Sequence, residues 1–157
     1  MAVKIKMLAM DVDGTLTDGK IYMGPQGEVC KAFNIKDGLG INQLIQNGIL
    51  PVIITGRKST IVENRAKELM ITEIYQGVED KATVLRQVAR KYGFTLGQVA
   101  YVGDDCNDLE VMEAAGLVFA PADAAKEVLE YADIVVTSRG GEGAVREVAD
   151  YLLKGQS

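Results

Sequence analysis

The sequence has no histidine among its 157 residues. This absence excludes serine and cysteine nucleophiles that depend on a histidine base, and it excludes zinc sites built on imidazole ligands. Cysteine is also scarce, because Cys30 and Cys106 are the only two, which is too few for a disulfide framework and is typical of a reducing compartment. Carboxylates, lysine, threonine and backbone amides must therefore carry any chemistry.

Long apolar runs and an excess of positive charge are missing as well. No stretch is long and apolar enough to cross a bilayer, and the apolar N-terminal run stops at Asp11 without a signal-peptide cleavage site, so we expect a cytoplasmic protein with no membrane partner. The formal net charge of -5 provides no basic field for nucleic acid. An acidic protein can still bind an anionic substrate if a local cation offsets the repulsion, which indicates a metal.

Apolar, β-prone runs alternate with helical patterns along the chain, which is typical of parallel α/β proteins. Asp37, Ser59, Asp80 and Asn107 stand where the N-caps of helices belong. The pattern predicts a doubly wound, Rossmann-like parallel sheet. Strands are expected at 5–10, 50–55, 73–75, 99–102, 117–119 and 134–136, and helices at 40–47, 60–69, 81–92, 109–115, 124–131 and 143–153.

Residues 19–33 interrupt this alternation. Two short β-prone runs flank Gly24-Pro25-Gln26-Gly27, which is typical turn chemistry. They predict a β-hairpin inserted after the first strand. The chain has no linker, repeat or low-complexity tract, so residues 1–157 are expected to form a single domain with no cap domain over the sheet.

The strongest chemical signal is Asp11-Val12-Asp13-Gly14-Thr15, directly after the first apolar run. Open α/β sheets bind ligands at the carboxyl ends of their strands, and strand alternation points the two aspartates the same way. A lone Asp-Gly more often ends a strand in a surface turn. Later motifs at other strand ends favour the functional interpretation.

Two further strand ends supply groups that can bind phosphate. Thr55 and Gly56 follow the second long strand, where a hydroxyl and successive backbone amides can hold phosphate oxygens. Lys81 begins a helix, so its ammonium can reach the same edge, although a lysine there is usually only a solvated charge. Each signal is weak alone, and together they indicate an anion site.

A third strand ends in an acidic loop that contains Asp104, Asp105 and Asp108. Carboxylates at this density repel one another unless a cation lies among them, and oxygen ligands suit magnesium. The alternative is a solvated surface loop. The sequence therefore predicts a Mg²⁺ site at the same sheet edge.

These motifs, in this order, resemble those of the haloacid dehalogenase superfamily, whose members carry Asp-x-Asp-Gly-Thr, a strand-terminal Thr, a Lys, and Gly-Asp-Asp with a further Asp. The resemblance covers essentially the whole chain. It implies that Asp11 attacks phosphorus and becomes an aspartyl phosphate, while Asp13 protonates the leaving group and then activates water.

The resemblance also assigns the binding roles. It implies that Thr55, the Gly56 amide and Lys81 hold the phosphate oxygens. Mg²⁺ would be bound by Asp11, the backbone carbonyl of Asp13 and Asp104. Asp108 would orient Lys81, and Asp105 would support the metal site from behind.

The short length, the hairpin after the first motif, and the segments 55–57 (Thr-Gly-Arg), 75–81 and 139–147 closely resemble one capless branch of the superfamily. This branch is the 3-deoxy-D-manno-octulosonate 8-phosphate phosphatases of lipopolysaccharide biosynthesis. This resemblance implies a homotetramer whose neighbouring subunits cover each active site. Arg57 and Arg65 are then candidates to bind the sugar carboxylate, because a guanidinium pairs with a carboxylate in bidentate fashion. Nine-carbon-specific relatives tend to carry an acid at the position of Arg57, so Arg57 favours the eight-carbon substrate.

Three alternatives remain at this stage. The substrate could be a nine-carbon sugar acid phosphate, either of the keto-deoxy or the N-acylneuraminate type. A receiver domain that accepts phosphate as a signal would also place acids, a Thr and a Lys at strand ends, but its phosphorylated Asp would end the strand that here ends in Thr55. A degenerate, non-catalytic subunit would be expected to lack motif residues, and none is missing.

Overall fold

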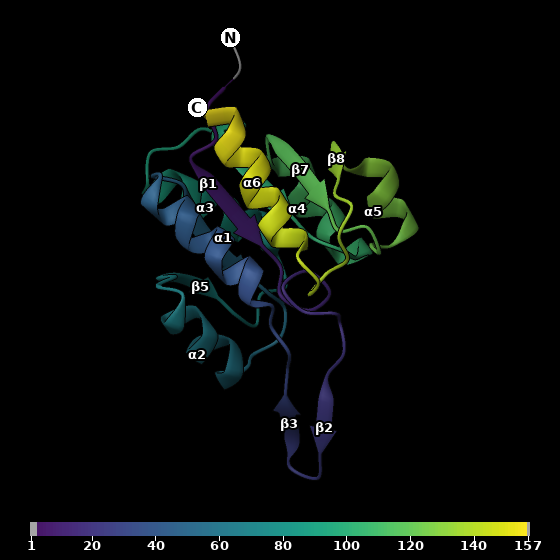
Figure 1. Ribbon diagram of the computed structural model, residues 1–157. Helices are drawn as coiled ribbons and strands as arrows, with labels where there is room; N and C mark the ends of the chain where they lie inside the picture. The colour runs from purple at the N-terminus through teal and green to yellow at the C-terminus, as the bar shows by residue number, and fades with distance from the viewer. Residues whose placement is uncertain (1–2, 157) are drawn as a thin grey trace.

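The computed structural model describes residues 3–156, which form one six-stranded parallel sheet and a separate two-stranded hairpin (Figure 1). The strand order is β5-β4-β1-β6-β7-β8, which confirms the predicted doubly wound sheet. The sheet strands are β1 (Met7–Met10), β4 (Leu50–Ile54), β5 (Glu73–Tyr75), β6 (Val99–Val102), β7 (Leu117–Ala120) and β8 (Ile134–Val135). The helices are α1 (Ile35–Gln46), α2 (Thr60–Glu68), α3 (Lys81–Lys91), α4 (Leu109–Ala114), α5 (Lys126–Tyr131) and α6 (Ala144–Gln156).

Helices cover both faces of the sheet and divide the core into two apolar layers. On one face α1, α2 and α6 contribute buried side chains such as Ile41, Val62 and Val148, and on the other α3, α4 and α5 contribute residues such as Leu85 and Val128. Because β1 is buried on both faces, it consists of the continuous apolar run that marked it in the sequence. None of the helices in the described range is long and apolar enough to span a membrane.

The predicted hairpin is present as β2 (Tyr22–Gly24) and β3 (Gly27–Cys30), an antiparallel pair. Figure 1 shows it projecting away from the helices, beyond the end of the sheet toward which β1 points. We call residues 19–33 the arm. Its base returns to the body at α1, so the arm connects directly to the edge that carries the sequence motifs.

The start of α1 corrects one prediction from the sequence. The helix begins well before residue 40, and its N-cap is Asn34, whose side chain accepts a hydrogen bond from the Lys36 amide, rather than Asp37. Asp37 lies inside the first turn and is buried, where it accepts a hydrogen bond of 2.9 Å from the Arg146 amide of α6. A long-range contact between two helices therefore took the place of the predicted local cap.

The acidic loop also differs from the expectation. Asn107 does not cap α4; residues Cys106–Asp108 form a 3-10 turn, and Asp108 is the N-cap residue of α4. Ser59 and Asp80 cap α2 and α3 as predicted. The turn directs the Asp108 side chain inward instead of leaving it on a solvated loop.

The glycine-rich segment after β8 packs against the loop that follows β1. A Cβ on Gly140 would lie only 1.9 Å from the carbonyl oxygen of Gly14, so no larger residue fits this approach without displacement. The Gly141 amide donates to the Thr15 carbonyl at 3.2 Å, and Asn34 donates to the Gly141 carbonyl at 3.3 Å. These contacts fix the backbone of the Asp11–Thr15 motif from outside the sheet.

Candidate active site

The register of the sheet brings the motif residues together at one edge. Met10 pairs with Ile53 of β4 and with Val102 of β6, so the residues that follow these three strands emerge at the same level. The Asp11 amide extends the ladder by donating to the Val102 carbonyl at 3.2 Å. A cleft of about 200 Å³ opens there, lined by Asp11, Asp13, Thr55, Gly56, Arg57, Asp104, Asp105 and Asn107.

Asp11 lies at the base of the cleft beside a buried lysine. Lys81 Nζ is 3.2 Å from Asp11 Oδ1 and 2.8 Å from Asp108 Oδ1, and all three side chains are less than one tenth exposed. Burial opposes the charge of Lys81, but the two carboxylates outweigh it and raise the pKa of its ammonium. The lysine is therefore charged and fixed next to the Asp11 carboxylate.

Asp108 has a complete set of partners of its own. Its Oδ1 accepts from Lys81 and, at 2.5 Å, from the Tyr101 hydroxyl, and its Oδ2 accepts from the Asp104 amide at 3.1 Å and the Asp105 amide at 3.3 Å. A carboxylate with four donors is held rigidly. Asp108 thus holds Lys81 by a hydrogen bond, and its role in orienting the lysine toward a phosphate stays a prediction.

Tyr101 was not singled out in the sequence. It is completely buried on β6, and burial together with the nearby Asp108 charge raises the pKa of its hydroxyl well above the usual value. The hydroxyl is therefore a proton donor to Asp108. The available signal was a tyrosine within an otherwise aliphatic buried strand, because a buried tyrosine needs a partner for its hydroxyl.

Asp104 brings a second carboxylate close to Asp11. Burial and the charges of Asp11 and Asp108 raise its pKa to about 8, and burial together with Asp108 raises the pKa of Asp11 to about 6. The Thr15 hydroxyl donates to Asp104 Oδ1 at 3.5 Å. A Cβ on Gly14 would lie 1.8 Å from Asp104 Oδ2, so the glycine of the motif makes room for this carboxylate.

This cluster fits a divalent cation. One carboxylate oxygen from each of Asp11, Asp104 and Asp108 lies within 4.8 Å of the others. Since the donors already described occupy Asp108, the carboxylates of Asp11 and Asp104 are the ones available to a cation. An all-oxygen set of this kind suits Mg²⁺, and a cation would offset the burial and the carboxylate repulsion that raise the pKa values of Asp11 and Asp104.

Thr55 and Gly56 form the side of the cleft next to Asp11. The Thr55 amide donates to the Tyr75 carbonyl at 2.9 Å, and its own carbonyl accepts from the Val78 amide at 3.1 Å, so its backbone is fixed between β4 and β5. Thr55 is buried, whereas Gly56 is exposed at the opening. The structure therefore brings both predicted phosphate-binding residues to the cleft.

Asp13 lies nearer the surface, at the base of the arm. Lys31 Nζ is 2.5 Å from Asp13 Oδ1, and Arg57 Nε is 3.9 Å from Asp13 Oδ2. Glu28 lies 3.7 Å from both cations. Lys31 was missed in the sequence, because nothing in a predicted hairpin indicates that one of its residues bends back to the sheet edge.

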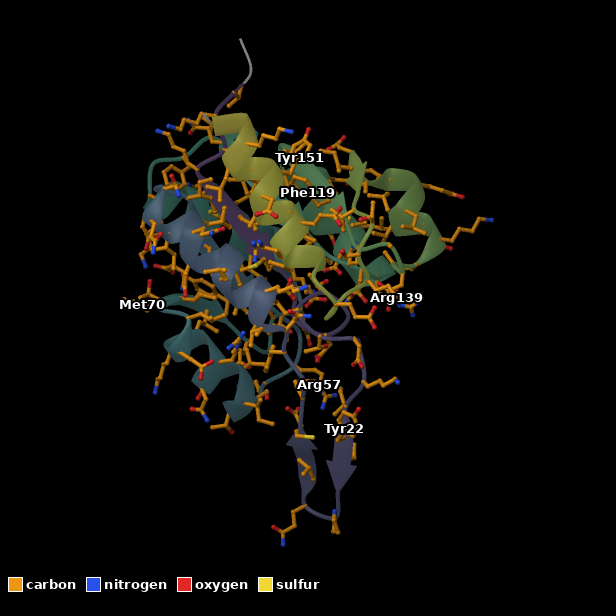
Figure 2. All side chains as sticks on the ribbon, in the orientation of Figure 1. Tyr22, Arg57, Met70, Phe119, Arg139 and Tyr151 are labelled. Atoms are coloured by element: carbon orange, nitrogen blue, oxygen red, sulfur yellow. The ribbon has the colours of Figure 1, made fainter. Side chains whose placement is uncertain are left out.

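The remaining predicted residues are divided between the cleft and another surface. Asp105 is exposed at the cleft, where it caps the 3-10 turn, and Arg57 lies at the junction of arm and body, as Figure 2 shows. Arg65 is not in the cleft of its own chain. Its guanidinium packs over the Phe33 ring and pairs with Glu68, and its predicted contact with substrate from an adjacent subunit stays a prediction.

Comparison with known proteins identifies relatives over nearly the full chain. A family model described as haloacid dehalogenase-like hydrolase matches residues 67–148. A 3-deoxy-D-manno-octulosonate 8-phosphate phosphatase of Escherichia coli K12, KdsC, is 48% identical over 155 residues, which cover 99% of this chain and 82% of that protein.

Solved structures agree with this comparison. The 3-deoxy-D-manno-octulosonate 8-phosphate phosphatase from Moraxella catarrhalis, in complex with a magnesium ion, a phosphate ion and a KDO molecule, is 46% identical with a TM-score of 0.92 and covers 96% of this chain and 86% of its own. The cobalt-bound form of the deoxy-D-mannose-octulosonate 8-phosphate phosphatase from Haemophilus influenzae is 39% identical with a TM-score of 0.95. The match covers 98% of this chain and 90% of that chain.

The crowding of Asp104 gives a prediction for the metal-free protein. Its raised pKa means that the folded state keeps a proton that the unfolded chain has lost, so the free energy of unfolding falls as pH rises from about 4 to about 8. Asp104→Asn removes this loss. We expect the variant to be more stable than wild type by about 1–3 kcal/mol at pH 8, with the difference vanishing near pH 4.

Urea unfolding in the presence of a chelator, repeated across this pH range, measures the effect. The matched control is Glu130→Gln, which removes one exposed negative charge from α5 and should change stability little at any pH. If the metal-free Asp104→Asn protein is less stable than wild type at pH 8, the raised pKa of Asp104 is contradicted.

Proposed function

Since the chain belongs to the haloacid dehalogenase-like hydrolases, we propose that it is a Mg²⁺-dependent phosphatase for a keto-deoxy sugar acid phosphate, which it hydrolyses through Asp11. The substrate we propose is 3-deoxy-D-manno-octulosonate 8-phosphate, with KDO and phosphate as products. The observation that carries the proposal is the buried Asp11–Lys81–Asp108 arrangement in a chain that is 48% identical to such a phosphatase. Residues 1–157 act as a single domain in this proposal, in the cytoplasm.

Asp11 is the nucleophile in this mechanism. It directly follows the central strand β1 at the base of the cleft, and its amide donates to β6, so its carboxylate meets a bound phosphoryl group in a fixed position. Attack on phosphorus gives an aspartyl phosphate, which water then hydrolyses. Lys81, held by Asp108 next to Asp11, binds the negative phosphate oxygens together with the Thr55 hydroxyl and the Gly56 amide.

Asp13 transfers the proton. It lines the same cleft, and it is more exposed than Asp11, with one fifth of its side chain accessible. It therefore reaches the leaving oxygen as the sugar departs and later accepts a proton from the attacking water. Mg²⁺, held by the Asp11 and Asp104 carboxylates and the Asp13 backbone carbonyl with Asp105 behind, would screen the phosphate charge from these acids.

Substrate selectivity depends on a cation away from the phosphate. Arg57 lies at the cleft opening with its side chain about half exposed, so its guanidinium is accessible to the carboxylate of a sugar acid. Arg65 would serve the same purpose only for a neighbouring subunit. A nine-carbon sugar acid phosphate is the alternative substrate, which a comparison of kcat/KM values between the two sugar phosphates distinguishes.

The first prediction from this mechanism is that Asp11→Asn loses at least about a thousandfold of kcat on the sugar acid phosphate, because the amide has the size of the carboxylate without its nucleophilic charge. The activity should also require Mg²⁺. Asp150→Asn, an exposed change on α6, is the control. Activity of Asp11→Asn within about tenfold of wild type, in protein free of contaminating phosphatase, would rule out this mechanism.

The second prediction is that Arg57→Ala lowers kcat/KM for the sugar acid phosphate about tenfold to a hundredfold, as loss of a charged hydrogen bond worth about 1.5–3 kcal/mol implies. A phosphate ester without a carboxylate should be affected much less. Arg90→Ala, at the exposed end of α3, controls for loss of a surface arginine. Equal losses on both substrates would mean that Arg57 serves Asp13 and the phosphate pocket rather than the carboxylate.

The third prediction is a homotetramer whose subunits cover the open cleft. The arm exposes Tyr22, Met23 and Val29, and the latter two are 64% exposed, so it presents apolar surface for association. Light scattering should give about four times the chain mass of 16.9 kDa. A monomer mass at micromolar concentration, with full activity, would show that the cleft works without a neighbour.

A further inference from the structure

The arm delivers a buried lysine to Asp13. The Lys31 side chain has no exposed surface, and its Nζ lies 2.5 Å from Asp13 Oδ1. Burial of an ammonium group is costly unless it is paired and hydrogen-bonded. The contact between arm and sheet edge is therefore a specific charged hydrogen bond and not a chance meeting of two surface residues.

Glu28, on β3 of the arm, forms an ion pair with this lysine, which follows the strand. Its Oε2 lies 3.7 Å from Lys31 Nζ and 3.7 Å from a terminal nitrogen of Arg57, and its Oε1 accepts a hydrogen bond of 2.7 Å from the Ser59 hydroxyl. Ser59 is the N-cap of α2 and belongs to the body. Glu28 therefore links the arm to the body next to the lysine that contacts Asp13.

We propose that Lys31 is the positioning residue for Asp13, holding the carboxyl group so that it can pass a proton to and from the leaving sugar and the attacking water. The proposal rests on the proposed function. None of the sequence motifs contains Lys31. It reaches the cleft because the arm extends from the loop after β1 and returns to the body at α1.

The two carboxylate oxygens of Asp13 have different partners and therefore different roles. Lys31 donates a hydrogen bond to Oδ1, whereas Arg57 Nε lies 3.9 Å from Oδ2, beyond hydrogen-bond distance, so Oδ2 is the oxygen that carries the proton. In the first step the bond between Asp11 and phosphorus forms, the bond from phosphorus to the sugar oxygen breaks, and that oxygen takes the Asp13 proton. In the second step water bonds to phosphorus and gives a proton to Asp13, while the Asp11–phosphorus bond breaks and releases phosphate.

This assignment predicts that phosphorylation of Asp11 depends on Lys31 only for substrates with a basic leaving group. An alkoxide leaving group is strongly basic and departs only as it is protonated, whereas acetate is a weak base that leaves without a proton. Lys31→Met keeps the length of the side chain and removes its donor. We expect the rate of Asp11 phosphorylation, measured by rapid quench in the first turnover, to fall at least about tenfold with 3-deoxy-D-manno-octulosonate 8-phosphate and to change less than about threefold with acetyl phosphate.

Lys20→Met is the matched control, because Lys20 lies on the arm with its side chain exposed and should change neither rate. Equal losses on both compounds, or no loss on either, would overturn the positioning role while leaving the phosphatase function intact. Wild-type protein that hydrolyses neither compound would refute the proposed function itself. If Lys31→Met does not fold, Lys31→Gln, whose neutral amide donates a weaker hydrogen bond, should show the same difference between the two compounds at a smaller size.

A double-mutant cycle separates positioning from a general structural effect. If Lys31 acts through Asp13, then Lys31→Met should cost little in a protein that already carries Asp13→Asn. If the double variant instead loses the product of the two single-variant factors in its phosphorylation rate with the sugar phosphate, Lys31 acts independently of Asp13 and the proposal is contradicted.

Discussion

The mutual repulsion of buried carboxylates at the end of β1 is the constraint on which the rest of the site depends. Asp11, Asp104 and Asp108 approach within 4.8 Å of one another, and Lys81 is the cation that meets two of them. One ammonium group leaves the cluster negative, and burial together with this negative charge raises the pKa values of Asp11 and Asp104. The same imbalance makes the cleft suitable for a divalent cation together with a phosphate.

The fold supplies the rigidity that such a cluster needs. Strand register sets the level at which the carboxylates emerge, and Tyr101 with two backbone amides fixes Asp108 from the core side. From the opposite side, the backbone of Gly140 packs on Gly14 so closely that a methyl group would not fit. Catalytic groups held in this way need little reorganisation when charge develops on the substrate.

The sequence predicted those parts of the site that depend on sheet topology. Asp11, Thr55 and Asp104 each follow an apolar strand, and parallel strands present their carboxyl ends at one edge, so their meeting could be anticipated. The contacts of Lys31 and Asp37 could not, because each depends on a partner far away in the chain: Asp13 across the returning arm, and the Arg146 amide across two packed helices. Local capping and hairpin rules contain no information on such partners.

The central claim is that Asp11 becomes phosphorylated during turnover, and chemical trapping tests it most directly. An acyl phosphate is reduced by borohydride to an alcohol, so a reaction quenched during turnover with the sugar acid phosphate and Mg²⁺ should yield homoserine at position 11 when its peptides are sequenced by mass spectrometry. The account predicts homoserine at that position alone, and none without substrate. Steady turnover with an unmodified Asp11, or reduction at a different carboxylate, would contradict it.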